Sequence, residues 1–141
     1  MAVRTGSAVW EGNLIDGSGR MKLESGAFEG AYSFRTRFED DPGTNPEELI
    51  GAAHAGCFSM ALSHILDQAG FTPKRVSTTA RVHLEKVEDG FKITTIELNT
   101  EAEIPGISNE DFAQHAEAAK AGCPVSQALT GAEIKLAAKL V

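Results

Sequence analysis

One segment, from Asn45 to about Ala69, constrains the fold of this 141-residue chain more than any other. Asn45 is a good helix N-cap, Pro46 suits the first helical position, and Glu48 completes a capping box. Gly70 is placed to end the helix in the left-handed conformation. The helix predicted between these signals is apolar over so much of its circumference that we expect it to lie centrally in the fold.

Strand-like patterns lie on both sides of this helix. Before it, residues 3–11 and the alternating run from Tyr32 to Phe38 predict strands separated by glycine-rich turns. After it, the pattern predicts a hairpin closed by an Asp-Gly turn, two helices and a final strand: Val76–Val87, Phe91–Ile104, Ser108–Ala121, Val125–Leu129 and Glu133–Val141. The predicted order β-β-β-α-β-β-α-α-β indicates a single α+β domain over residues 1–141.

Charge and composition narrow the classes of function. The net charge is −7 and no basic stripe is visible, so nucleic acid and anionic membranes are poor partners. The first residues lack the apolar core of a signal peptide, and no run approaches the roughly 18 apolar residues of a membrane span. We therefore expect a cytoplasmic protein that binds neither nucleic acid nor a membrane.

The two cysteines carry the strongest chemical signal. A structural disulfide is not expected in a reducing compartment, so Cys57 and Cys123 are buried small residues, metal ligands or redox-active thiols. Cys123 precedes Pro124 at the predicted N-cap of the third helix, where unpaired backbone N–H groups favour a thiolate. Cys57 lies in an apolar helix, where burial raises the thiol pKa, so it needs a cationic partner. Electrostatics alone leaves open which sulfur attacks first.

Arg35 and Arg37 are the basic residues nearest to Cys57 before the helix, and Arg37 and Glu47 bracket a short Asp-Pro-Gly loop. A pair between Arg37 and Glu47 would fix the guanidinium while leaving donors for a thiolate and a peroxide oxygen; the alternative is an ordinary partly exposed ion pair. Ten residues of helix separate Glu47 from Cys57 by about 15 Å, so they cannot touch within one straight helix. If both serve one site, the helix bends or Glu47 comes from a second subunit, and the small residues of the helix favour the second subunit.

Other residues have less specific interpretations. His54 and Cys57 share a helix face and Cys123 could add a third zinc ligand, yet a fourth ligand and a C-x-x-C motif are missing. No metal or cofactor is expected on this pattern. Trp10 is interpreted as a core residue rather than a platform for a substrate.

Two long motifs resemble the osmotically inducible protein C (OsmC/Ohr) family. The stretch TNPEELIGAAHAGCFSMALS at 44–63 is similar to the central-helix motif of that family, and AGCPVSQAL at 121–129 is similar to its second cysteine motif. The intervening GFTPKRVSTTARVHLEKVEDGF and the strand 36–39 resemble the osmotically inducible branch. The resemblance covers essentially the whole chain.

This resemblance implies a thiol peroxidase of stress defence that reduces organic hydroperoxides to alcohols without a cofactor. It implies that Cys57 attacks the peroxide and becomes a sulfenic acid, and that Cys123 condenses with it to form a disulfide. Arg37 would stabilise the thiolate and the leaving oxygen, with Glu47 orienting Arg37. The fold implied is an intertwined homodimer with antiparallel sheets around two central helices, regenerated by a dithiol such as a dihydrolipoyl group or a lipoylated protein.

Two alternatives stay open beside this interpretation. The organic hydroperoxide resistance branch places its catalytic arginine earlier, in a glycine-rich loop, which makes Arg20 a rival of Arg37; the Arg-Phe-Glu context favours Arg37. A redox sensor or binding protein could use the same cysteine pair without turnover, although no DNA-binding motif is visible. Turnover with a dithiol reductant distinguishes the two.

Overall fold

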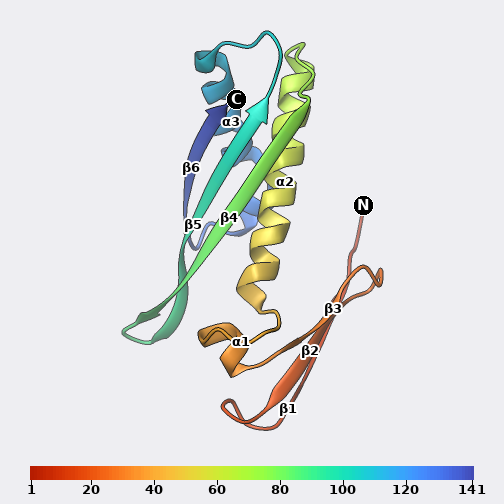
Figure 1. The fold of residues 1–141 in the computed structure, drawn as a ribbon, viewed down its shortest axis with the longest axis vertical. Coiled ribbons are helices and arrows are strands. Elements are labelled where there is room, and N and C mark those ends of the chain that lie inside the picture. The colour runs from red at the N-terminus through yellow and green to blue at the C-terminus, as the bar shows by residue number, and fades with distance from the viewer. The chain divides into compact units, whose positions relative to one another are not determined.

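The computed structural model describes residues 1–141 and confirms the predicted α+β class, with one helix more than expected (Figure 1). The elements are β1 (Gly6–Glu11), β2 (Ser18–Leu23), β3 (Glu29–Tyr32), α1 (Phe34–Phe38), α2 (Pro46–Gln68), β4 (Arg75–Val87), β5 (Gly90–Glu103), α3 (Asn109–Gly122), α4 (Pro124–Ala128) and β6 (Glu133–Leu140). The chain divides into two compact units, Met1–Leu49 and Ile50–Val141, with the boundary in the first turn of α2.

The first unit contains an antiparallel sheet in the order β1-β2-β3. Trp10 on β1 and Tyr32 on β3 pair on opposite sides of Gly19, and their ring centroids lie 5.4 Å apart. A Cβ at Gly19 would lie 2.6 Å from the Tyr32 ring and 2.8 Å from the Trp10 ring. A glycine is therefore required at this position because the two aromatic rings close over the strand.

The segment after β3 corrects the sequence prediction, because Phe34–Phe38 forms helix α1 rather than a strand. Ser33 caps this helix: its hydroxyl accepts from the Thr36 backbone amide at 3.2 Å, and the Thr36 hydroxyl accepts from the Ser33 amide at 2.9 Å. Phe34 and Phe38, four residues apart, bring their rings to 4.9 Å. That spacing fits a helix turn as well as it fits an alternating pattern, and the capping box decides between them.

The second unit places α2 and α3 against one three-stranded sheet, ordered β4-β5-β6 (Figure 1). The strands β4 and β5 form the predicted antiparallel hairpin, whereas β5 and β6 are parallel. The expectation of purely antiparallel sheets was therefore wrong for this pair, because a crossover through α3 and α4 returns the chain in the same direction. The core of this unit comes from α2, β5, the residue that follows β5, and α3: Phe58, Leu62, Leu66, Leu98, Ala102, Ile104, Phe112, Ala116 and Ala119.

The limits of helix α2 agree with the signals in the sequence. The Glu48 amide donates to the Asn45 side chain at 2.8 Å, and Gly70 follows the helix with φ of +90°. The Glu48 carboxylate departs from the expected capping box, because it accepts from the Thr44 hydroxyl at 2.8 Å. Gly51 packs closely on β4, where a Cβ would lie 3.2 Å from the Ala80 carbonyl oxygen.

Helix α2 also corrects the statement that no segment resembles a membrane span. By length and composition it could cross a membrane, with a mean hydropathy of 1.4 over its most apolar window. The core helix of a protein outside the membrane meets the same criterion. Phe58, Leu62 and Leu66 are fully buried in the core of the second unit, so one face of α2 has a packing role.

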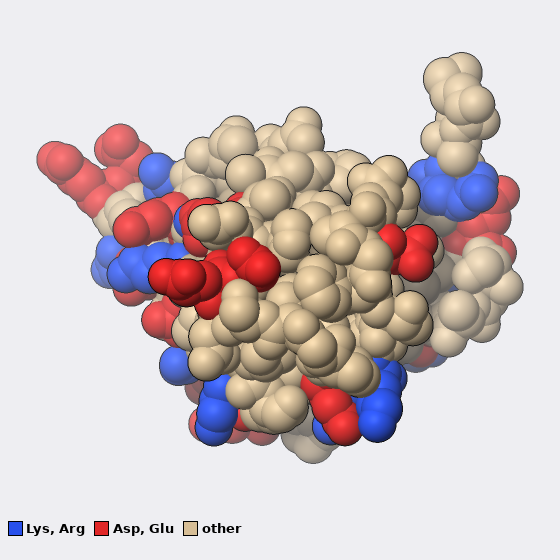
Figure 2. Space-filling view, turned by 90° about the horizontal axis from the view of Figure 1, so that it is seen from above, with Lys and Arg blue, Asp and Glu red and all other residues tan.

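Charged side chains of both signs mix on the face drawn in Figure 2. Lys and Arg are seen among Asp and Glu on this face. The distribution agrees with the net charge of −7.

Candidate active site

The two predicted thiols lie next to each other in the second unit. Cys57 lies in the middle of α2 and Cys123 at the N-cap of α4, and their Sγ atoms are 2.7 Å apart with both cysteines free. Cys123 is fully buried, whereas Cys57 is only partly buried. Residues 66 positions apart in the chain are thus brought within reach of a disulfide bond.

The surroundings of Cys57 within this unit favour the protonated form of its thiol. Burial raises the pKa of Cys57 above its ordinary value, and the neighbouring Cys123 thiol raises it further. A hydrogen bond from the Val125 backbone, in the first turn of α4, lowers the pKa of Cys57 but does not reverse the direction. Because the thiolate is the nucleophile, this pair needs an added positive charge to react quickly.

His54 lies one turn before Cys57 and does not join the thiols as a zinc ligand. Its Nε2 is hydrogen-bonded to the Ser126 hydroxyl at 2.7 Å, and both side chains are buried. Burial lowers the pKa of His54, which keeps the ring neutral near pH 7. No three His, Cys, Asp or Glu side chains in the chain gather into a metal-binding group, so the zinc alternative lacks its ligand cluster.

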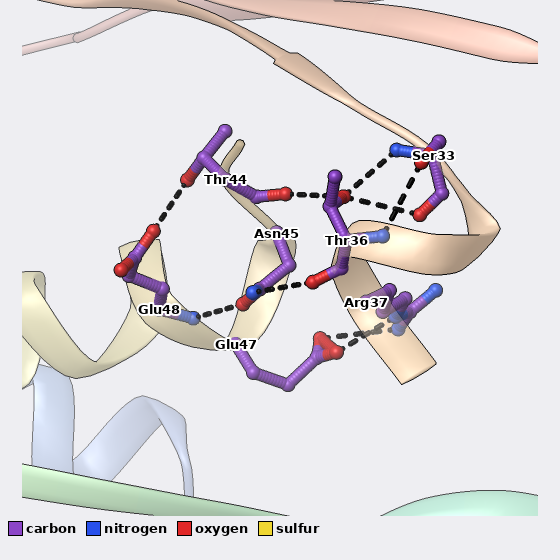
Figure 3. A network of polar contacts seen from close by, with 7 residues as sticks. All are labelled: Ser33, Thr36, Arg37, Thr44, Asn45, Glu47 and Glu48. Carbon is purple, nitrogen blue, oxygen red and sulfur yellow. Dashed lines mark hydrogen bonds and ion pairs between the residues drawn. The ribbon is translucent and has the colours of Figure 1, made fainter. Parts of the chain in front are cut away.

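Arg37 and Glu47 form the predicted pair in the first unit (Figure 3). The Arg37 Nε donates to Glu47 Oε1 at 2.7 Å, and Nη2 donates to Oε2 at 3.1 Å. The Glu47 side chain is 9% exposed and that of Arg37 is 37% exposed. This bidentate geometry fixes the guanidinium plane and leaves the Nη1 amino group free to bind another acceptor.

A hydrogen-bonded network around Thr36 holds this arginine in place (Figure 3). The Thr36 hydroxyl donates to the Thr44 carbonyl at 2.7 Å, and the Asn45 side-chain amide donates to the Thr36 carbonyl at 3.1 Å. These bonds tie α1, which carries Arg37, to the residues that begin α2. Helix α1 therefore presents Arg37 in a defined position.

Arg20, the rival arginine, has a different environment. It lies on β2 and pairs with Glu29 of β3, with an Nη2–Oε2 distance of 2.9 Å. Its side chain is 59% exposed, against 37% for Arg37. Arg20 thus has the environment of a surface ion pair across two strands, and Arg37 has the more buried partner.

Sequence reasoning missed an aromatic hollow beside Arg37. The hollow measures about 290 Å³ and is lined by Trp10, Leu14, Tyr32, Ser33, Phe34, Arg37 and Phe38. The Arg37 guanidinium carbon lies 5.5 Å from the centre of the Phe38 ring. Recognising the four-residue spacing of Phe34 and Phe38 as a helix turn would have indicated this cluster, and Trp10 belongs to it rather than to a core.

The candidate residues therefore form two groups, one in each unit. Arg37 and Glu47 belong to Met1–Leu49, and Cys57 and Cys123 belong to Ile50–Val141. The first group offers a fixed cation beside an apolar hollow. The second offers two adjacent thiols that lack a cation of their own.

Comparisons with known proteins agree on one family. The model described as OsmC-like protein matches residues 38–139. Peroxiredoxin OsmC of Escherichia coli (strain K12) is 55% identical over 134 residues, which cover 94% of this chain and 93% of that protein. Organic hydroperoxide resistance protein OhrB of Bacillus subtilis is 31% identical over 72% of this chain and 74% of its own length. The crystal structure of an organic hydroperoxide resistance protein from Elizabethkingia anophelis superposes with a TM-score of 0.76, at 28% identity, and covers 99% of both chains.

Proposed function

Because the chain belongs to the OsmC-like protein family, as its two motifs predicted, we propose that it is a thiol peroxidase that reduces organic hydroperoxides to alcohols in stress defence. The observation that carries the proposal is the Cys57–Cys123 pair, with 2.7 Å between sulfurs that lie 66 residues apart in the chain. Adjacent free thiols, one of them partly exposed, are what a two-cysteine peroxidase requires.

In the first step the Cys57 thiolate attacks the terminal oxygen of the hydroperoxide. The O–O bond breaks, the alkoxide takes a proton and leaves as the alcohol, and Cys57 becomes a sulfenic acid. Arg37 serves this step by favouring the thiolate and by donating to the leaving oxygen, where negative charge develops. Glu47 orients Arg37 through the bidentate pair described above.

In the second step the Cys123 thiol attacks the Cys57 sulfur, the S–O bond breaks, and water leaves as the disulfide forms. A dithiol reductant then exchanges with this disulfide and restores both thiols while becoming a disulfide itself. We assign this role to a dihydrolipoyl group, free or on a lipoylated protein, because a dithiol of that class completes the exchange within one molecule.

We further propose that the active form is a homodimer of the OsmC-like fold, intertwined around two central helices. The rise of a helix separates Glu47 from Cys57 by about 15 Å, so a site built from both needs a second subunit or a bend. An exposed stripe on α2 supports the subunit explanation, because its small residues Ala52, Ala53 and Gly56 and the 77% exposed Met60 invite close packing. Residues 1–141 would then act as a single cytoplasmic domain.

The aromatic hollow supports a preference for organic substrates. It lies beside Arg37, which we propose as the residue that contacts the peroxide oxygens, and its walls include Trp10, Tyr32 and Phe34. An apolar substituent on the peroxide would occupy such walls, whereas hydrogen peroxide has no group to place there. Cumene hydroperoxide should therefore react faster than hydrogen peroxide.

The test is peroxide turnover with excess dihydrolipoamide, for the wild type, Cys57→Ser and Cys123→Ser. Cumene hydroperoxide should be preferred, Cys57→Ser should be inactive, and Cys123→Ser should form one sulfenic acid per chain without turnover. If fully reduced wild-type protein consumes no peroxide, the enzyme proposal fails. A single oxidation without turnover by dithiols would instead indicate a redox sensor.

A further inference from the structure

A second contact joins α2 to α4 one helical turn away from the thiol pair. His54 precedes Cys57 by three residues on α2, and Ser126 follows Cys123 by three residues into α4. The His54 Nε2–Ser126 Oγ distance is 2.7 Å, equal to the distance between the two sulfurs. The two helices are thus joined by two parallel links, one between thiols and one between an imidazole and a hydroxyl.

Helix α4 depends on such contacts for its position. It spans only Pro124–Ala128, and Cys123 at its N-cap makes no side-chain capping bond. So short a helix has little stability of its own, because nucleation is costly and few hydrogen bonds follow it. Its first turn nevertheless supplies Cys57 with both Cys123 and a backbone hydrogen bond from Val125. A small movement of α4 would remove both from Cys57.

His54 is an unusual residue to find at this place if packing were its only role. Its ring is fully buried, and Nδ1 has no hydrogen-bond partner. Burying an unpartnered polar nitrogen costs stability, and an apolar side chain of similar shape would avoid that cost. What the imidazole provides and an apolar ring does not is the bond from Nε2 to Ser126.

We propose, building on the peroxidase function above, that His54 and Ser126 are positioning residues that hold α4 in the register at which Cys123 reaches Cys57. They act on the second step, in which the Cys123 sulfur must approach the sulfenic acid in line with the departing oxygen. Without this clamp, condensation slows and the sulfenic acid persists. A second hydroperoxide then oxidises Cys57 to the sulfinic acid and leaves as an alcohol, which removes the enzyme from the cycle.

The experiment follows both oxidation steps separately in Ser126→Ala. Reduced protein is mixed with one equivalent of cumene hydroperoxide and quenched at intervals with dimedone, and mass spectrometry counts the sulfenic acid and the disulfide. We expect disulfide formation to slow by about tenfold or more, since small misplacements of reacting groups have effects of this size. Sulfenic acid should accumulate, and sulfinic acid should appear with excess peroxide. Ser126→Thr, which keeps the hydroxyl, should restore the wild-type rate.

Two further variants separate positioning from general stability. Ser59→Ala is the matched control, because the Ser59 hydroxyl donates to Thr78 Oγ1 at 2.7 Å and links the same helix to β4 rather than to α4. It should lose stability and still form the disulfide at the wild-type rate. His54→Phe fills the same space without Nε2, and it replaces Ser126→Ala in the test if that variant does not fold.

Disulfide formation by diamide, an oxidant that needs no peroxide chemistry, distinguishes the clamp from the function on which it rests. If the wild type ignores cumene hydroperoxide while diamide closes the disulfide slowly in Ser126→Ala, the peroxidase proposal fails and the clamp stands. Closure at the wild-type rate in Ser126→Ala and His54→Phe would overturn the clamp. Equal slowing in Ser59→Ala would also overturn it, since the effect would then reflect stability alone.

Discussion

The two units hold their reactive groups by different means. In Ile50–Val141 the thiols belong to elements fixed by a continuous apolar core, and Cys123 itself is fully buried. In Met1–Leu49 the arginine is held by hydrogen bonds around Thr36 and by its pair with Glu47, and it stays partly exposed. Packing positions Cys57 and raises the pKa of its thiol, whereas the hydrogen-bonded network holds the Arg37 guanidinium at a partly exposed position. No cation acts on the pKa of the Cys57 thiol within its own unit, and we propose that Arg37 supplies one.

The largest effect should come from removing a large side chain from the core of Ile50–Val141, the unit that contains both thiols. Phe58 is fully buried beside Cys57 in the sequence, and Phe58→Ala should lower the free energy of unfolding by about 3–5 kcal/mol. Chemical denaturation measures this loss. Val9→Ala, at a 63% exposed position on β1, is the control and should stay within about 0.5 kcal/mol of the wild type. A small loss in Phe58→Ala would contradict the view that packing places the thiols.

Removing the Arg37 guanidinium should slow the chemical reaction without unfolding Met1–Leu49, the unit that contains this arginine. Arg37→Met should slow the reaction of Cys57 with cumene hydroperoxide by about 10²–10³-fold, the size of effect seen when a group that stabilises developing charge is lost. Arg37→Lys should recover only part of the rate, because an ammonium cannot form the bidentate pair. Arg20→Met, which removes the exposed partner of Glu29, serves as the control in stopped-flow measurements. A larger loss in Arg20→Met would transfer the role to Arg20.

Weakening the Arg37–Glu47 ion pair should slow the reaction less than removing the Arg37 charge. Glu47→Gln keeps the size of the side chain but weakens its bonds to Nε and Nη2 of Arg37. We expect a rate loss of about tenfold, because the guanidinium remains but is less well oriented. Combining Glu47→Gln with Arg37→Met should add little to the loss in Arg37→Met. Additive losses would show that Glu47 acts independently of the arginine.

The smallest effect should come from the network behind the arginine. Thr36→Val removes the hydroxyl that donates to the Thr44 carbonyl and should cost about 1 kcal/mol of unfolding free energy. The rate with cumene hydroperoxide should fall by a few-fold, since Arg37 lies on the helix that this bond anchors. Thr36→Ser retains the hydroxyl and should behave as the wild type in both measurements. An unchanged free energy of unfolding in Thr36→Val would show that the hydrogen bonds around Thr36 do not hold Arg37 in place.

The sequence predicted the parts of this comparison that depend on local signals. The cap at Asn45, the hairpin at Gly90 and the Arg37–Glu47 pair across a short loop all followed from neighbouring residues. The sequence pattern did not predict what depends on distant segments. The parallel pairing of β5 with β6 and the bond of His54 to Ser126 join segments whose packing is set by the whole fold.

Helix α1 shows why one local prediction failed. The run from Tyr32 to Phe38 is too short for an alternating pattern to be told from a helical one, and Ser33 decides the outcome through its cap. The aromatic hollow was missed for the same reason, because it requires Phe34 and Phe38 on one turn beside the sheet that carries Trp10.

The most direct test is the ionisation of Cys57 with and without Arg37. We propose that Arg37 supplies the positive charge that Ile50–Val141, the unit with both thiols, lacks next to Cys57. The ultraviolet absorbance of the thiolate is followed against pH in Cys123→Ser, which leaves Cys57 as the only thiol, and in the same protein carrying Arg37→Met. We expect a pKa of Cys57 below the ordinary thiol value of about 8.5 when Arg37 is present. In Arg37→Met we expect a pKa above that value, because burial then outweighs the lowering effect of the Val125 backbone hydrogen bond. Equal titration curves in the two proteins would contradict this proposal.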